Sequence, residues 1–448
     1  MDSEKTKDQT RLLTRRSFLG DAAAGAAFSL VPAEVLAGGG PPPSDRLNIA
    51  GIGVGNRGQA VLSECETENI VALCDVDPQY ASETFETYPN AEIFTDYRRM
   101  FDRMGGDIDA VVIATPDHAH AAVTMAALDL KKHVYCEKPL AHTVAEVRRM
   151  REKARETNVT TQMGNQGHSG EGTRLIHEWI NAGAIGPVRE VHCWTPLHGS
   201  YYWPRHMEPK KASAAPDHLA WDLWCRPTPR KPYSPSYHPR HWRAWWHFGC
   251  GMLGDMGCHH MDAPYWALDL QAPSRVEASC SQTNAARAPD RSIVTYTFPA
   301  RNERGPVKLR WYDGDIKPPR PAQLKAGRNL RKMGILFVGE NGCLHSGHTG
   351  EDPVLIPMSR MEDFDLPPEH LPRVEKSHPQ HWIECCKQGK QADSGFHYSG
   401  GLAEIVLLGT VAIRARKPIE WDAEAMKITN VPEANRFLRP NFRKGFSL

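Results

Sequence analysis

The feature that most constrains the fold is a short apolar segment that runs directly into a glycine-rich turn. Residues 47–52 precede Gly53, Gly55 and Gly58, and residues 59–66 are compatible with a helix. This spacing after a strand is typical of dinucleotide-binding folds, because it permits a tight turn and close approach of the backbone to a pyrophosphate. Backbone N–H groups at the helix start would bind the phosphates. The triplet alone is weak evidence, so its context decides.

A second apolar segment strengthens this interpretation. Residues 70–74 end at Asp75, about twenty residues beyond the glycines, where a carboxylate suits the ribose hydroxyls of NAD and repels the additional phosphate of NADP. The alternative is that Asp75 only caps a helix or a turn, a part that Asp77 could play instead. We therefore expect NAD as the cofactor, with NADP less favoured.

Three more apolar segments continue the pattern, at residues 110–114, 133–137 and 160–164, with helix-compatible stretches between them. This alternation predicts a parallel, doubly wound α/β sheet. In such sheets ligands bind just beyond the carboxyl ends of the strands. The polar residues Lys138, Asn165 and Gln166 at two of these predicted strand ends are therefore candidate ligand contacts.

Lys138 is the most informative of these residues. The apolar run before it stops at Glu137, and Pro139 follows it directly. Proline fixes its own φ and disfavours helix for the residue before it, so the lysine side chain would project in a defined direction. The alternative is a surface lysine in a turn, which is the commoner fate of a single Lys-Pro pair.

The second half of the chain shows a different pattern. Strand-like segments occur at residues 188–194, 274–283, 292–298 and 307–312, which favours hairpins over further βαβ units, whereas residues 378–388 and 401–416 look helical. Between about residues 194 and 248 lies an insertion that holds seven of the twelve tryptophans. Aromatic rings there, Trp245 among them, either stack on a sugar or pack the loops onto the sheet.

Residues 251–262 carry the next candidate chemistry. If this segment is helical, Asp255, His259 and Asp262 fall on one face. A carboxylate and an imidazole one turn apart suit a proton relay, because the carboxylate can fix the tautomer of the ring. The adjacent His259 and His260 also raise the alternative of a metal site, but no second pair of ligands is evident, so no metal is expected.

The glycine turn with Arg57, the Ala-Thr-Pro-Asp-x-x-His loop that ends at His120, and Glu137-Lys138-Pro139 occur in a characteristic order and spacing. In these motifs the chain resembles the Gfo/Idh/MocA oxidoreductases, the family of glucose–fructose oxidoreductase and inositol dehydrogenase, from about residue 47 to the C-terminus. The resemblance implies a Rossmann domain at residues 46–166. It also implies an α+β substrate domain at residues 167–448 with a large, mostly antiparallel sheet, through which the chain would form a dimer or tetramer.

The resemblance also assigns roles to residues. It implies Lys138, Asp255 and His259 as the catalytic group, with either Lys138 or His259 taking the proton. The implied cofactor contacts are Gly53, Gly55, Asn56, Arg57, Gly58, Asp75, Thr115, Pro116, His120, Glu137 and Lys138. The candidate substrate contacts are Lys138, Asn165, Trp245, Asp255 and His259.

These assignments predict an NAD(P)-dependent oxidoreductase that acts on a secondary hydroxyl of a sugar, glycoside or polyol. Two alternatives stay open. One is a redox-neutral glycosidase, lyase or epimerase that keeps its NAD tightly bound. The other is a non-catalytic homologue that binds a sugar or a nucleotide, because a fold alone does not establish an activity.

The N-terminus indicates export. Arg15-Arg16 with Phe18-Leu19 precedes a weakly apolar run, and Ala37 suits cleavage, so residues 1–37 resemble a twin-arginine signal peptide and residues 38–45 a linker. This route exports folded proteins, which predicts a periplasmic protein that carries its cofactor from the cytoplasm. The sugar-acting branch of the family that is exported by this route has similar aromatic segments.

The composition limits which classes of partner the chain is expected to bind. The net charge is +1 with no block of like charges, so neither nucleic acid nor an anionic membrane is expected as a partner. No run of 18 apolar residues occurs, so no membrane span is expected. The eleven cysteines include no Cys-x-x-Cys pair, and we expect no structural disulfide.

Overall fold

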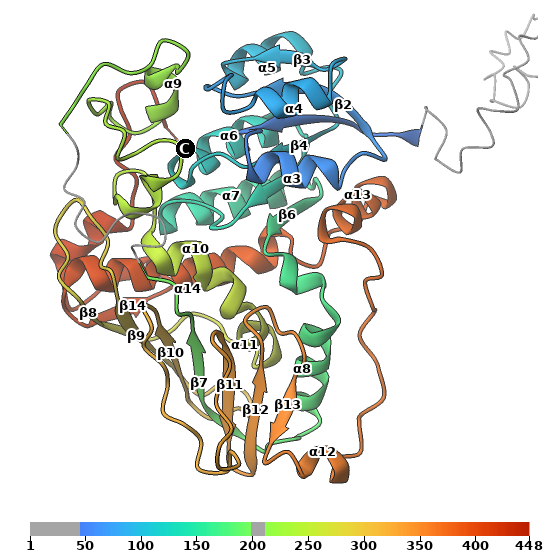
Figure 1. Ribbon diagram of the computed structural model, residues 1–448, viewed down its shortest axis with the longest axis vertical. Coiled ribbons are helices and arrows are strands. Elements are labelled where there is room, and N and C mark those ends of the chain that lie inside the picture. The colour runs from blue at the N-terminus through green and yellow to red at the C-terminus, as the bar shows by residue number, and fades with distance from the viewer. Residues whose placement is uncertain (1–44, 199–210, 448) are drawn as a thin grey trace, which may run out of the picture. The chain divides into compact units, whose positions relative to one another are not determined.

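The first half of the chain folds around a six-stranded parallel sheet with the strand order β3-β2-β1-β4-β5-β6 (Figure 1). The computed structural model describes residues 45–198 and 211–447. The predicted signal peptide, most of the linker and part of the aromatic insertion lie outside these residues. The strands are β1 (Asn48–Ile52), β2 (Asn69–Cys74), β3 (Glu92–Phe94), β4 (Ala110–Ile113), β5 (His133–Glu137) and β6 (Thr161–Gly164).

The helices between these strands cover both faces of the sheet, so its central strands read as continuous apolar runs. All four residues of β4 are buried, as are four of the five residues of β5. The helices are α3 (Arg57–Ser63), α4 (Ser82–Thr87), α5 (Tyr97–Met104), α6 (Asp117–Asp129) and α7 (Val144–Thr157). Helix α7 begins at a capping box, because the Thr143 hydroxyl accepts from Glu146 N–H and donates to the Glu146 carboxylate.

The second half forms a nine-stranded sheet with the order β13-β12-β11-β7-β10-β9-β8-β14-β15. Neighbouring strands pair antiparallel, except that β10 and β7 run parallel. The strands are β7 (Val188–Trp194), β8 (Arg275–Cys280), β9 (Ser292–Phe298), β10 (Val307–Tyr312), β11 (Gly334–Gly339), β12 (Gly342–Ser346), β13 (Val354–Ile356), β14 (Ile419–Asp422) and β15 (Lys427–Ile428).

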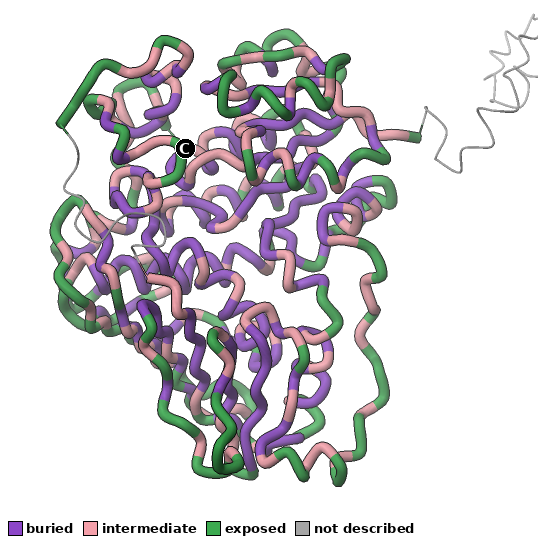
Figure 2. Tube along the Cα trace, viewed as in Figure 1, coloured by how far each residue is buried: buried purple, intermediate pink, exposed green. Residues whose placement is uncertain are grey.

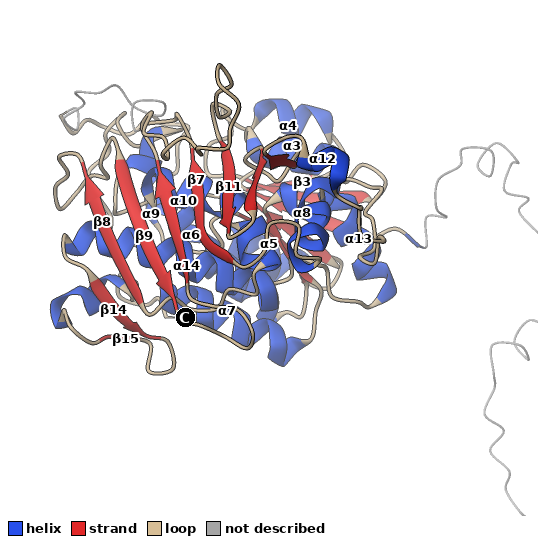
Figure 3. Cartoon of the chain, turned by 90° about the horizontal axis from the view of Figure 1, so that it is seen from below, coloured by secondary structure: helices blue, strands red, loops and turns tan. Residues whose placement is uncertain are grey.

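Helices cover one face of this sheet, and Figure 3 shows α10 and α14 behind its strands. The α-helices of the second half are α8 (Glu171–Asn181), α9 (Trp221–Cys225), α10 (Gly251–His260), α11 (Asp262–Ala267), α12 (Arg360–Asp363), α13 (His378–Gln388) and α14 (Phe396–Ala415). Short 3-10 helices are η2 (Gln166–Ser169), η4 (His241–Ala244) and η5 (Pro432–Phe437).

Helix α14 is the central element that both halves share. It packs on α7 from the first half and on α10 and β8 from the second (Figure 1). Its length and composition would allow it to cross a membrane, but 83% of its most apolar window is buried inside the protein, as Figure 2 also shows. The two sheets therefore belong to one unit that extends from Arg46 to Leu448.

The predicted fold class is confirmed: an α/β Rossmann sheet followed by an α+β part with a mostly antiparallel sheet. Helix α14 begins at Phe396, five residues earlier than the sequence pattern indicates. Its adjacent glycines look like a helix break but serve packing, because a Cβ on Gly401 would lie 2.1 Å from the Tyr265 hydroxyl. All eleven cysteines are free thiols.

Helix α13, from the second half of the chain, packs against the first sheet. Its Trp382 is fully buried, and its ring lies 5.7 Å from that of Tyr135 on β5, measured between centroids. We therefore expect Trp382→Ala to lower the free energy of unfolding by about 3–5 kcal/mol, because it leaves a large cavity. Chemical denaturation measures this loss. Leu366→Ala, at a side chain that is 62% exposed, is the control and should change stability by about 0.5 kcal/mol or less.

Candidate active site

A cavity of about 480 Å³ lies at the carboxyl ends of the parallel strands β1, β2, β4 and β5. This is where a doubly wound sheet binds its ligands. Three groups of residues line it. The strand-end loops supply Gly55, Asn56, Arg57, Asp75, Val76, Tyr80, Ala114, Thr115, Pro116, Asp117, His120, Glu137, Lys138 and Gln166. The aromatic insertion supplies Trp224, His238, Pro239, Arg240, Trp242 and Arg243, and α10 supplies Asp255, Met256 and His259.

The glycine turn has the close geometry that a pyrophosphate site requires. Gly53 has a φ of 77°, a conformation that favours glycine. A Cβ on Gly58 would lie 2.1 Å from the carbonyl oxygen of Gly53, so no other residue fits there without moving the backbone. Helix α3 begins directly after Asn56, so the turn leads straight into a helix N-terminus. The turn therefore fits a dinucleotide.

Asp75 lies next to this turn. Its Oδ2 accepts from the N–H groups of Val54 at 2.9 Å and Gly55 at 3.3 Å. Burial raises the pKa of the carboxyl group to about 6. Asp75 also borders a smaller cavity of about 70 Å³, between Thr95, Tyr97 and α6. Asp75 therefore lies between the glycine turn and this smaller cavity.

Glu137 is held on two sides by its neighbours. Its Oε1 accepts from Arg57 Nε at 2.8 Å and from Gln166 Nε2 at 3.0 Å, and Gln166 also donates to the Tyr135 hydroxyl. The carboxylate thus joins the glycine turn, β5 and the loop after β6. His120 similarly joins two strand ends, because its ring nitrogens lie 2.7 Å and 2.8 Å from the carbonyl oxygens of Thr115 and Pro139.

Lys138 makes the central contact of the cavity. Its Nζ donates to the backbone carbonyl of Asp255 at 2.8 Å and to the Asp255 carboxylate at 2.9 Å. Arg243 Nε lies 3.2 Å from the same carboxylate oxygen. The two side chains of the pair are 14% and 8% exposed, so this is a nearly buried ion pair. The peptide bond between Lys138 and Pro139 is cis.

His259 lies one helical turn beyond Asp255 and also lines the cavity. Burial and the nearby charge of Lys138 lower the pKa of His259 well below its ordinary value, so the ring is neutral at neutral pH. Its Nδ1 is buried without a hydrogen-bond partner in the described part of the chain. The structure thus brings Asp255, His259 and Lys138 together, but the Asp255 carboxylate holds Lys138 and leaves the imidazole without that partner.

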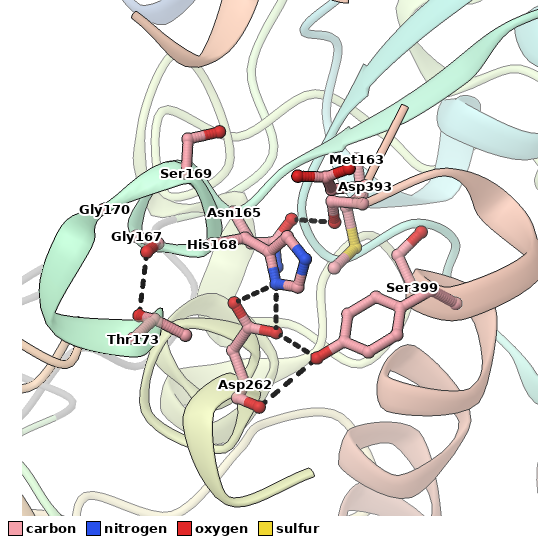
Figure 4. Close-up of polar contacts among 12 residues, drawn as sticks. Met163, Asn165, Gly167, His168, Ser169, Gly170, Thr173, Asp262, Asp393 and Ser399 are labelled. Carbon is pink, nitrogen blue, oxygen red and sulfur yellow. Dashed lines mark hydrogen bonds and ion pairs between the residues drawn. The ribbon is translucent and has the colours of Figure 1, made fainter. Parts of the chain in front are cut away.

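Asp262 does not share a face with these two residues. Helix α10 ends at His260, and Asp262 begins the next helix, α11, so the predicted periodicity is interrupted. Its carboxylate lies 3.0 Å from His168 Nδ1 and accepts from the Tyr398 hydroxyl at 2.6 Å (Figure 4). Asp262 and His168 are 3% and 2% exposed, so this contact lies in the core and not in the cavity.

Two predicted substrate contacts do not line the cavity. Asn165 is fully buried, and its amide oxygen accepts from the Ser394 hydroxyl (Figure 4). Trp245 is 4% exposed and donates from its indole to the carbonyl of Ser236, in a cluster of aromatic side chains within the insertion. The rings that do line the cavity from the insertion are those of Trp224 and Trp242.

The sequence interpretation also missed several lining residues. Asp117 is 4% exposed, accepts from Cys250 N–H, and has a pKa that burial raises to about 7. Its position directly after Pro116 could have signalled it. Tyr80, Arg240 and Arg243 carry no local signal, because they reach the cavity only through the folding of loops. Among the described residues, no group of three or more His, Cys, Asp or Glu side chains has the arrangement of a metal site.

Comparison with known families agrees with this geometry. Residues 47–165 match the family model described as "oxidoreductase family, NAD-binding Rossmann fold", and residues 173–301 match the model of the C-terminal alpha/beta domain of the same family. Together the two matches span more than half of the chain. The chain belongs to the Gfo/Idh/MocA family. The described cavity is formed by residues from both matched regions.

Similar proteins within the Gfo/Idh/MocA family include two curated dehydrogenases. A levoglucosan dehydrogenase of Pseudarthrobacter phenanthrenivorans is 31% identical over 116 residues, which cover 26% of this chain and 29% of that protein. An inositol 2-dehydrogenase of Burkholderia multivorans is 33% identical over 154 residues, covering 33% and 45% respectively. These matches thus span less than half the length of either relative.

A solved structure extends the likeness in fold to most of the chain. The WlbA dehydrogenase of Bordetella pertussis, in complex with NADH and UDP-GlcNAcA, superposes with a TM-score of 0.57 at 17% identity, covering 84% of this chain and 99% of that one. At this identity the likeness shows a shared fold.

The position of Asp75 generates a pH-dependent prediction. The carboxylate that would accept from a ribose hydroxyl is present above its pKa of about 6 and is lost below it. We expect NAD affinity to fall by about tenfold between pH 7 and pH 5, because Asp75 becomes protonated. Titration calorimetry at several pH values measures this change.

Asp75→Asn should bind NAD more weakly at pH 7 and show little further loss on acidification. Asp109→Asn is the matched control, because Asp109 accepts from Asn48 N–H and does not line the cavity. A pH dependence that persists unchanged in Asp75→Asn would contradict the assignment.

Proposed function

We propose that this protein is an NAD-dependent oxidoreductase that acts on a secondary hydroxyl of a sugar, glycoside or polyol. One observation carries the proposal. The ammonium group of Lys138, fixed by Asp255, lies in the same cavity as a neutral imidazole and a dinucleotide-type glycine turn. A hydrogen-bond donor, a proton acceptor and a cofactor cradle are the groups that oxidation of an alcohol requires.

The structure favours a division of roles between Lys138 and His259. The contacts with the Asp255 carboxylate and carbonyl fix Lys138 Nζ in the cavity, which suits it to donate to the substrate oxygen and to stabilise negative charge there. The neutral ring of His259 suits it to take the hydroxyl proton. Bound NAD would supply the hydride acceptor. Glu137, fixed by Arg57 and Gln166, would hold the nicotinamide ribose.

Two observations support the substrate class: the names of the curated relatives, and the tryptophans that line the cavity. Levoglucosan and inositol dehydrogenases are named for a sugar derivative and a polyol. Trp224 and Trp242 line the cavity of this chain at 5% and 6% exposure, so they give one wall a small apolar surface against which a sugar can pack. A carbohydrate hydroxyl is therefore the substrate that we propose, without a choice of sugar or ring carbon.

Tight binding of the cofactor is part of the proposal. The insertion is anchored to the loop after β2, because His238 Nε2 lies 2.7 Å from the Asp77 carboxylate and Ala220 N–H donates to the carbonyl of Val76. Residues 238–243 then form one wall of the cavity. A dinucleotide in the cavity would lie between the glycine turn and this wall, which would slow its release.

This enclosed arrangement also supports a second candidate, a redox-neutral enzyme that oxidises a sugar, eliminates or epimerises, and then returns the hydride to the product. An enzyme of that kind needs a cofactor that stays bound through every turnover. Aryl glycosides incubated with the purified protein and no added NAD distinguish the two. Release of the aglycone without NADH favours the redox-neutral candidate, and NADH in proportion to substrate favours the dehydrogenase.

We also propose that the protein is exported by the twin-arginine route to the periplasm and assembles as a dimer or tetramer through the second sheet. The twin arginines, the apolar run that follows them and the small residues before position 38 support export. Fractionation of cells that express the full chain, and light scattering of the purified protein, test these two points.

Substitution of Lys138 tests the catalytic assignment. We expect Lys138→Ala to lower kcat/KM by about 10²–10³-fold, because the developing charge on the substrate oxygen loses its donor. NAD should remain bound, since the glycine turn and Asp75 are unchanged. A panel of sugars followed at the NADH absorbance, with mass spectrometry of the cofactor released on denaturation, gives both measurements.

His259→Asn should also reduce turnover strongly, and it removes the group that we assign as the base. Lys308→Ala serves as the control, because this exposed lysine on β10 does not line the cavity. Unchanged turnover in Lys138→Ala would refute the mechanism, and a protein that binds NAD but oxidises no sugar would indicate a non-catalytic homologue.

A further inference from the structure

A second cavity, of about 360 Å³, lies on the other side of the wall formed by the insertion. Residues from five parts of the chain line it: the insertion, the start of α7, the loop between β8 and β9, the end of α14 and the C-terminal segment 436–442. Trp242 and Arg243 face the candidate active site, whereas Trp245, Trp246 and His247 face this second cavity. It therefore shares a wall with the active site but contains none of the catalytic group.

Arg414 is the unusual residue of this second cavity. Its guanidinium lies 5.5 Å from the centre of the Trp246 ring and 4.1 Å from that of Phe437. Within the part of the chain that the structure describes, it forms no hydrogen bond or ion pair. Two other arginines that are largely removed from water do form ion pairs, Arg148 with Glu404 and Arg174 with Asp393. A cation that is partly removed from water gains free energy from an anion beside it, so Arg414 is a suitable anchor for an anionic ligand.

The other charged side chains that line the second cavity are mostly cationic as well. Arg436, Arg439 and Lys231 line the same cavity, and none of the three forms an ion pair with a described residue. The one acidic residue in the lining is Glu146, whose carboxylate already accepts from the Thr143 hydroxyl at 2.8 Å and is 1% exposed. Burial raises the pKa of Glu146 to about 7, which reduces its negative charge further. The cavity is therefore strongly cationic.

We propose that this second cavity binds a sugar-sized anion, a molecule with a carboxylate, sulfate or phosphate group that pairs with Arg414. Guanidinium groups bind such oxyanions through two parallel hydrogen bonds. The ring of Trp246 packs against the guanidinium and helps to fix its position, and the volume of the cavity suits a monosaccharide derivative. A neutral sugar would leave the charge of Arg414 unpaired, so the site should discriminate by charge.

Measurements of ligand affinity, which do not depend on catalytic activity, test whether the second cavity binds anions. Titration calorimetry of the full protein, saturated with NAD so that the glycine turn is not a competing anion site, compares glucuronate and sulfate with neutral glucose. We expect glucuronate and sulfate to bind, and added sodium chloride to weaken their binding. Arg414→Gln should weaken both by about tenfold or more, because it removes a charge-assisted pair.

Matched variants separate the local charge from a general effect. Arg416→Gln lies two residues away at the same helix end but does not line the cavity, and it should bind as the unsubstituted protein does. Should Arg414→Gln fail to fold, Arg436→Glu reverses an exposed charge in the lining and should weaken binding as well. Equal binding of glucose and glucuronate, or unchanged affinity in the Arg414 or Arg436 variant, would overturn the proposal.

Discussion

The ion pair between Lys138 and Asp255 is the contact on which the candidate site depends. A lysine that is largely removed from water needs an acceptor for its charge, and here the nearest strands of its own sheet do not supply it. The acceptor comes from α10, 117 residues further along the chain, and contributes both a carboxylate and a backbone carbonyl. The cavity therefore exists only where the two halves of the protein meet.

This requirement explains the position of α14. Its side chains pack against α7, which follows Lys138, and against α10, which carries Asp255 and His259. A shift between the two halves would separate the ammonium from its acceptor at a nearly buried position. The large apolar interface around α14 thus stabilises the geometry of the site as well as the fold.

Much of the first half could be predicted from local patterns. Each parallel strand is a short apolar run that ends at a polar residue, so the rule on strand ends located Asp75, Thr115, Glu137 and Lys138 together at one edge. The glycine turn was also predictable, since Gly58 is required by a contact with Gly53 only five residues away. These features depend on neighbours in sequence, so a local pattern is enough to predict them.

The residues whose positions differ from the prediction depend instead on contacts that are distant in sequence. Asn165 follows a strand end as expected, but Ser394, which is distant in sequence, holds its side chain in the core. Helical spacing placed Asp262 beside His259, whereas the helix ends between them, and a buried histidine, His168, takes the carboxylate. Aromatic content marked the insertion, but it did not distinguish Trp242, which lines the cavity, from Trp245, which packs within the loops.

The contact between His238 and Asp77 bears on the rate at which a bound molecule could leave the cavity. It fixes the insertion, which forms a wall of the cavity, to the loop beside the dinucleotide turn. If the cofactor binds as tightly as we propose, its release would be slower while this contact holds the wall in place, because opening the wall would require the contact to break. The fraction of the purified protein that contains NAD would then depend on how much NAD was present where the chain folded.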